Sequence, residues 1–277
     1  MDKRISVRTY STTVPEGELF ERIQRIIKKE RKGPFGNRYS MTFMDIDKSS
    51  IEDLGKMTSY GMIKNARFYF GGYADGGDRA IIDYGYCFEE VLLELTDLDL
   101  GTCWVGGTFG RSFIASLLSL PEGKVIPAIS PLGYPHEKRA FVEKLTRMLA
   151  RSRRRKPLSK ILFKQNDEEG LAPVHPEDLQ SPLNEIFHAV QHGPSASNKQ
   201  PWRIVMHNDM FHFYCDYNKT YNALIKGFHI QSLDMGIALC HFTKAAEELR
   251  LKGKFSYSDP KYEKVDWIYI LSWNIKR

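Results

Sequence analysis

A repeated pattern inside the chain constrains its fold more than any other feature. Residues 83–100 and 234–251 have equal length, begin with Asp-x-Gly and end with an apolar-x-Leu triplet, and the second stretch lies 151 positions after the first throughout. In both, apolar residues recur at three- and four-residue spacing, which predicts a long helix buried on a broad face. Because a duplicated sequence usually builds one structural unit twice, we expect two similar halves.

Shorter similarities extend the repeat through each half. Gly-Pro precedes a loop and then an alternating apolar strand in residues 32–44, and again in residues 192–206. The other predicted elements are helices at 16–31 and 181–193 and strands at 66–73, 125–135, 211–217 and 265–273. This order predicts an α+β fold made of two tandem half-domains, residues 1–158 and 159–277.

Two polar segments separate the predicted halves. Residues 137–156 have the pattern of a basic helix, and residues 164–182 have the polar, proline-containing composition of a linker. Much of the net charge of +6 lies in the run Arg-Ser-Arg-Arg-Arg-Lys at 151–156. A local anion site and a solvated charge run explain this concentration equally well, and a basic face for nucleic acid is disfavoured.

Composition places the chain among soluble globular proteins, with 42% hydrophobic and 27% charged residues. No apolar run approaches the roughly 20 residues that span a bilayer, so we expect no membrane partner and a cytoplasmic location. The cysteines show no CxxC spacing, which favours reduced thiols and predicts no metal site. They are Cys87, Cys103, Cys215 and Cys240.

The segment Gly-Pro-Ser-Ala-Ser-Asn-Lys-Gln-Pro-Trp at 193–202 is the first candidate site. Its small side chains would let a flat ligand approach the backbone closely. The amides of Asn198 and Gln200 could pair with the edge of a heterocycle, while Trp202 would anchor the loop in the core. A serine-rich turn that caps a strand explains the same residues equally well.

Two other segments are candidate ligand contacts. Arg4, Ser6 and Arg8 alternate, so in an extended chain their side chains point the same way and suit a phosphate. Arginines near a terminus are, however, more often simply solvated. Residues 100–107 contain glycines that would allow a ligand to lie against bare backbone, although a helix end followed by a turn also accounts for them.

Together these strings resemble the FMN-dependent nitroreductase family, and in particular its members with two half-domains fused in one chain. The resemblance is carried by Arg-Ile-Ser-Val-Arg-Thr-Tyr at 4–10, Leu-Gly-Thr-Cys-Trp-Val-Gly-Gly at 100–107, Arg-Arg-Arg-Lys-Pro-Leu at 153–158 and the segment at 193–205. It implies a nitroreductase-like fold in which the halves form an internal pseudo-dimer, with long helices at its centre and flavin held between the halves.

The resemblance also implies roles for individual residues. Arg4 and Ser6, with Arg153 and Arg155, would bind the FMN phosphate, and Arg8 would lie near the pyrimidine edge of the flavin. The backbone of the 104–107 segment would face the reactive nitrogen; its residues are Trp104, Val105, Gly106 and Gly107. The loop that covers the flavin would consist of Pro194, Ser195, Ala196, Asn198 and Gln200. Each motif occurs in only one half, which implies one FMN per chain.

The function implied is an FMN-dependent NAD(P)H oxidoreductase that reduces nitroaromatic, quinone-like or other conjugated acceptors by a ping-pong hydride mechanism. Flavin carries this chemistry itself, so no catalytic side chain is singled out. A flavin-binding protein for storage or sensing is the alternative, and a nucleic-acid-binding module that uses residues 151–156 is a third. We expect a small-molecule electron acceptor as partner, no nucleic acid, and either a monomeric pseudo-dimer or a homodimer.

Overall fold

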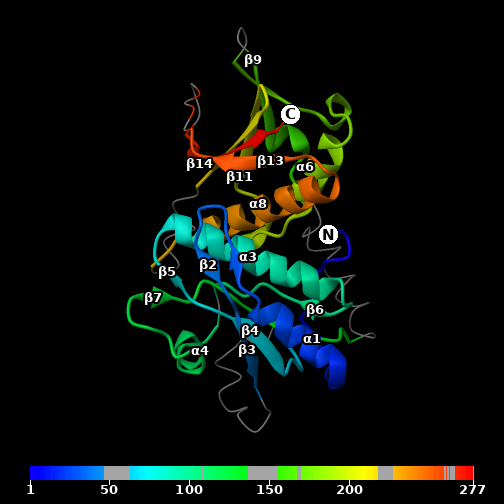
Figure 1. Ribbon diagram of the computed structural model, residues 1–277, viewed down its shortest axis with the longest axis vertical. Coiled ribbons are helices and arrows are strands. Elements are labelled where there is room, and N and C mark those ends of the chain that lie inside the picture. The colour runs from blue at the N-terminus through cyan, green and yellow to red at the C-terminus, as the bar shows by residue number, and fades with distance from the viewer. Residues whose placement is uncertain are drawn as a thin grey trace.

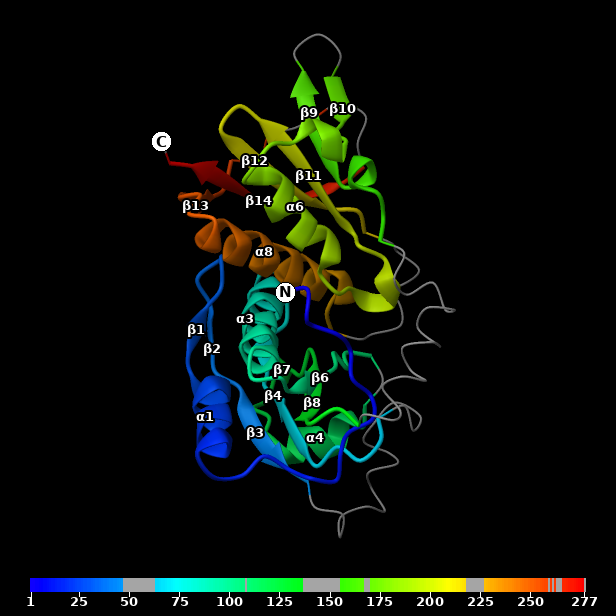
Figure 2. The same cartoon turned by 90° about the vertical axis from the view of Figure 1, so that its right-hand side faces the viewer.

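The computed structural model describes residues 1–46, 63–107, 109–136, 155–166, 170–217, 227–258, 260, 262 and 266–276. Two sheets lie at opposite ends of an elongated molecule, and two long helices, α3 (Asp78–Thr96) and α8 (Ile230–Glu248), lie side by side between them (Figures 1 and 2). The mixed helix-and-sheet fold expected from the sequence is therefore confirmed.

The first sheet is antiparallel and has the strand order β3-β4-β8-β6. Its strands are β3 (Thr42–Asp45), β4 (Phe68–Gly71), β6 (Gly101–Thr102) and β8 (Ile129–Gly133). Helix α1 (Gly17–Lys28) packs on α3 and β3. The smaller elements of this part are β1 (Arg31–Lys32), β2 (Arg38–Tyr39), β5 (Ala74–Asp75), α4 (Arg111–Leu117) and β7 (Lys124–Val125).

The second sheet has six strands in the order β10-β9-β11-β12-β14-β13, and only the β9–β11 pair is parallel. Its strands are β9 (Leu162–Asn166), β10 (Gly170–Pro173), β11 (Trp202–His207), β12 (Met210–Cys215), β13 (Gly253–Ser256) and β14 (Ile268–Ile275). Helix α6 (Leu183–His192) and α8 pack against this sheet through aromatic contacts such as Phe187–Phe211 and Phe213–Phe242. Three short 3-10 turns complete this part: η3 (Leu158–Lys160), η4 (Pro176–Asp178) and η5 (Ala196–Asn198).

The prediction of a linker at 164–182 is wrong for residues 164–166 and 170–173. Strands β9 and β10 form an antiparallel hairpin there, and β9 joins the sheet by pairing with β11. The buried side chain of Leu162 starts β9 in the core, whereas the polar residues that follow lie on a partly exposed hairpin. Polar composition therefore does not exclude a strand at the edge of a sheet. The predicted basic helix at 137–156 lies outside the described residues, except for Arg155 and Lys156, which are not helical.

Helices α3 and α8 touch backbone to backbone where they cross. A Cβ added to Gly236 would lie 2.6 Å from the Tyr86 amide nitrogen, and a Cβ added to Gly85 would lie 2.6 Å from the Leu233 carbonyl oxygen. Glycine is required at both positions because only a missing side chain allows this approach. Gly85 and Gly236 are equivalent positions of the sequence repeat, so the contact is reciprocal.

The cysteines and the hydrophobicity of the helices were also subjects of prediction. All four cysteines are buried, and none of them forms a disulfide bond with another of the four. Within the described ranges, the structure contains no helix with the length and hydrophobicity needed to cross a bilayer.

Candidate functional site

The Pro-Ser loop at 194–200 is held from α8. The Asp234 carboxylate accepts the Ala196 N–H at 2.9 Å, and the Ser195 hydroxyl accepts the Gln200 N–H at 2.9 Å. Ser197, Asn198 and Gln200 have φ angles of 49°, 55° and 44°, in the left-handed region. The loop is thus a tight, internally bonded structure rather than an open turn.

The structure gives the Gln200 side chain partners within the protein. Gln200 is fully buried; its Oε1 accepts the Lys156 N–H at 2.7 Å and its Nε2 donates to the Gln191 carbonyl at 2.8 Å. The amide that was predicted to read the edge of a ligand therefore joins the 155–156 segment to the end of α6. The cause is the loop backbone, which turns this side chain inward. Trp202 is fully buried, which confirms its predicted role as the anchor of the loop.

Arg155 lies against the same loop. Its Nη1 donates to the Asn198 side-chain oxygen at 2.6 Å, and its Nη2 donates to the His192 carbonyl at 2.9 Å. Burial, followed by the positive charge of Arg4, lowers the pKa of Arg155. Two of the predicted phosphate ligands thus lie close enough to repel each other. Arg153, the other predicted ligand in this run, lies outside the described residues.

The Arg4 guanidinium has an unsatisfied donor. Its side chain is only 6% exposed, and its Nε lies 3.6 Å from Oε1 of Glu89. Its Nη1 is buried and has no hydrogen-bond partner in the part of the chain that the structure describes. A buried donor without a partner costs roughly 1–3 kcal/mol, and more when it is charged, so this nitrogen favours an anionic ligand.

Ser6 and Arg8 follow Arg4 along the edge of the first sheet. Ser6 forms a parallel bridge with Thr102, and the next residue, Val7, donates its N–H to the Thr102 carbonyl at 2.9 Å. Arg8 is half-buried, and its guanidinium forms no hydrogen bond or ion pair with any described residue. The extended segment therefore carries Arg4, Ser6 and Arg8 beside β6.

The 104–107 segment follows β6 directly and lies near the start of α8. The Val105 N–H donates to the Ile129 carbonyl at 3.0 Å, and the Gly106 carbonyl accepts Nη2 of Arg111 at 2.9 Å. A Cβ on Gly106 would have the Ile230 side chain as its nearest described neighbour, at 3.6 Å, and Gly107 is exposed. The segment thus offers backbone at the boundary between the two parts of the molecule.

Glu89 connects these segments, and sequence reasoning missed it. This fully buried α3 residue accepts the Trp104 indole N–H at 2.6 Å and a hydrogen bond from Nε2 of His241 on α8 at 2.9 Å. Burial raises the pKa of Glu89, but the His241 hydrogen bond and the charge of Arg4 outweigh it, so the net shift is downward. Glu89 is therefore ionised. The same helix also carries Glu90 and Glu94, so the sequence contains no signal that distinguishes Glu89 from its more exposed neighbours.

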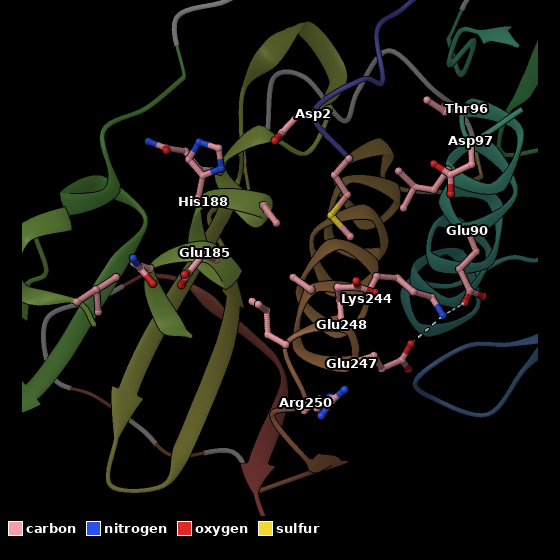
Figure 3. A pocket seen from close by; sticks show the side chains of 18 of the residues that line it. Asp2, Glu90, Thr96, Asp97, Glu185, His188, Lys244, Glu247, Glu248 and Arg250 are labelled. Atoms are coloured by element: carbon pink, nitrogen blue, oxygen red, sulfur yellow. Dashed lines mark hydrogen bonds and ion pairs between the residues drawn. The ribbon is translucent and has the colours of Figure 1, made fainter. Parts of the chain in front are cut away.

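A large cleft of about 1370 Å³ lies elsewhere, between α3, α6 and α8 (Figure 3). Its lining is rich in carboxylates, and Lys244 bridges Glu90 at 2.6 Å and Glu247 at 3.1 Å. None of the predicted ligand contacts that lie in the described ranges lines this cleft.

A solved structure is similar to this chain over nearly its whole length. A structure described as a putative nitroreductase from Thermotoga maritima MSB8 is 20% identical, with a TM-score of 0.57, and the match covers 99% of this chain and 90% of that one. At this identity the likeness shows the fold alone. No curated protein matches the chain.

Other solved structures match about half of the chain. An FMN-dependent nitroreductase from Clostridium difficile R20291 is 22% identical over 48% of this chain and 84% of its own, with a TM-score of 0.40. A nitroreductase family protein from Clostridium novyi NT is 19% identical over 50% of this chain and 84% of its own, with a TM-score of 0.41. The model of the family described as "Putative TM nitroreductase" matches residues 1–246, so the chain belongs to this nitroreductase family.

Proposed function

We propose that the chain is an FMN-dependent NAD(P)H oxidoreductase. The observation that carries this proposal is the buried Nη1 of Arg4, which has no partner among the described residues. It lies near Arg155 and belongs to the same cluster as Trp104 and the Pro-Ser loop. A buried arginine with an unsatisfied donor and a half-buried arginine beside it fit a phosphate, because phosphate oxygens accept charge-assisted hydrogen bonds. The residues present therefore fit FMN.

Specific residues would hold each part of the cofactor. Arg4, Ser6 and Arg155 would bind the phosphate, together with Arg153, and Arg8 would place positive charge at the pyrimidine edge. The backbone of 104–107 would lie along one side of the ring, and the loop from Pro194 to Asn198 would cover it. Gln200 would support the loop from beneath, since its amide already bonds to backbone groups.

The chain's own residues would bind and orient, and the cofactor would supply the redox chemistry. When bound, FMN would take a hydride from NAD(P)H and pass the electrons to a nitroaromatic, quinone-like or other conjugated acceptor in separate half-reactions. The Arg8 guanidinium, without a partner among the described residues, would stabilise negative charge that develops on the ring. No side chain is required as an acid or base.

We also propose that the chain is an internal pseudo-dimer with halves at 1–158 and 159–277. Asp83 and Asp234 are equivalent positions of the repeat, and each binds the Gly-Pro loop of its own half. Asp83 accepts a hydrogen bond from the Phe35 N–H at 2.8 Å, and Asp234 accepts one from the Ala196 N–H at 2.9 Å. The reciprocal approach of Gly85 and Gly236 supports the same relationship.

The two clefts of this pseudo-dimer would be unequal. Where the second half has its serine loop, the first half has Phe35, and Arg79 lies over the rings of Phe35 and Tyr257 at 5.5 and 5.2 Å. The second half also has no Arg-x-Ser-x-Arg segment at its start. These differences support one FMN per chain.

The test is an absorbance spectrum of the protein mixed with FMN and freed of excess, followed by NADH and NADPH oxidation with and without a quinone or nitroaromatic acceptor. Bound flavin with acceptor-dependent turnover would support the proposal. Bound flavin with negligible turnover would replace it with the storage or sensing function. Failure to bind FMN would reject both.

A further inference from the structure

We infer that Glu89 is a positioning residue for FMN, which aims Arg4 at the phosphate, and that His241 from α8 holds Glu89 in place. This inference rests on the proposed function. It concerns two residues that the resemblance did not include and that lie 152 positions apart in sequence.

One carboxylate brings together three segments. Oε1 of Glu89 faces Nε of Arg4 at 3.6 Å and Nε2 of His241 at 2.9 Å, while Oε2 accepts the Trp104 indole N–H at 2.6 Å. Glu89 thus lies between the predicted phosphate ligand and the start of the segment predicted to face the flavin ring. A movement of Glu89 would disturb both.

The contact constrains how Arg4 points. Because Nε is directed towards Glu89, the plane of the guanidinium is restricted, and Nη1 remains without a partner among the described groups. A long side chain held in its binding orientation loses less conformational entropy when the ligand arrives. Glu89 would therefore increase phosphate affinity without touching the phosphate.

His241 fixes the position of the Glu89 carboxylate from α8. Its Nδ1 lies 2.9 Å from the Ala189 carbonyl and its Nε2 lies 2.9 Å from Glu89, so both ring nitrogens face acceptors. The two contacts hold the imidazole ring between α6 and Glu89, so the carboxylate that faces Arg4 cannot move without losing its hydrogen bond to His241.

The experiment compares FMN with riboflavin, which lacks the phosphate, as titrants of the flavin-free protein. We expect Glu89→Gln to weaken FMN binding roughly tenfold and riboflavin binding much less, because a misdirected Arg4 would lose most of its charge-assisted hydrogen bond to the phosphate. The direction of the affinity change distinguishes positioning from simple electrostatics. Removal of a negative charge beside Arg4 would, by electrostatics alone, tighten FMN binding. An unchanged or increased preference for FMN overturns the inference.

A second variant tests the transmission from α8. His241→Gln should lower the FMN preference in the same direction, although His241 contacts none of the proposed FMN ligands. Tyr86→Phe is the matched control, since it removes another buried hydrogen bond between α3 and α8, from Tyr86 to Thr243 at 2.8 Å, that does not reach Arg4. This control should reduce thermal stability and leave the FMN-to-riboflavin ratio unchanged.

The outcomes separate this inference from the proposed function. If the wild-type protein does not bind FMN, both are overturned. If the wild-type protein binds FMN, the ratio of FMN affinity to riboflavin affinity decides the inference. A ratio for His241→Gln, or for a folded Glu89→Gln, that equals the ratio for Tyr86→Phe overturns only the inference. Circular dichroism of every variant establishes that it is folded, and His241→Gln decides the case if Glu89→Gln does not fold.

Discussion

Asp83 and Asp234 occupy equivalent positions of the repeat but differ in how well they are satisfied. Asp83 accepts hydrogen bonds from the Phe35 N–H and from both the backbone and the side chain of Asn37. Among the described groups, Asp234 accepts a hydrogen bond only from the Ala196 N–H, through Oδ1. Its Oδ2 is buried without a partner among those groups. Burial, partly opposed by the Ala196 hydrogen bond, raises the pKa of Asp234 to about 8.

This shift predicts a particular dependence of stability on pH. Between about pH 4, where an unfolded carboxyl titrates, and pH 8, the folded chain retains a proton that the unfolded chain has released. The contribution of Asp234 to stability is therefore complete below pH 4 and is lost as pH rises to 8, by up to about 1.4 kcal/mol per unit. Asp234→Asn should flatten this decline in urea denaturation between pH 5 and 8. Asp97→Asn, at an exposed site, is the control, and equal slopes for wild type and Asp234→Asn would contradict the prediction.

Arg4 permits a second prediction at the residue scale. Arg4→Met should weaken FMN binding about 10- to 100-fold, because a hydrogen bond to a charged group contributes roughly 1.5–3 kcal/mol. Riboflavin binding should change little, since it has no phosphate. Titration of the flavin-free protein measures both affinities. Arg25→Met removes the same charge from the exposed face of α1 and should leave both unchanged. A similar loss for the two flavins would exclude a phosphate role for Arg4.

At the scale of elements, the crossing of α3 and α8 depends on glycine. Gly236→Ala would drive a methyl group into the α3 backbone at Ile82 and Tyr86, so we expect a loss of at least about 3 kcal/mol, the upper range for overpacking. The unfolding free energy in urea measures this. Gly76→Ala is the matched control, because the nearest atom to its added Cβ is 3.5 Å away. A loss below about 1 kcal/mol at Gly236 would show that the helices separate at little cost.

At the scale of the whole molecule, the proposed function predicts how many flavins one chain would bind. The proposed ligands come from both halves, with Arg4 beside the first sheet and the serine loop next to β11, and the corresponding residues of the other cleft are absent from the sequence. Release of flavin by denaturation should therefore yield one FMN per chain. Phe35→Ser should also yield one, since a smaller loop residue does not create the missing arginines. Two FMN per chain in either protein would contradict the unequal clefts.

The sequence by itself determined the elements and the family. Helices α3 and α8 and the strands β3, β4, β8, β11, β12 and β14 follow from local residue patterns. The strings around Arg4, Trp104 and Ser195 carry the family resemblance within short segments. Only the tertiary structure showed that Gln200 is buried under its loop, that residues 164–166 and 170–173 join a sheet, and that Glu89 meets His241. The physical reason is that a polar group's partners and burial depend on segments brought together by folding, and local spacing contains no record of them.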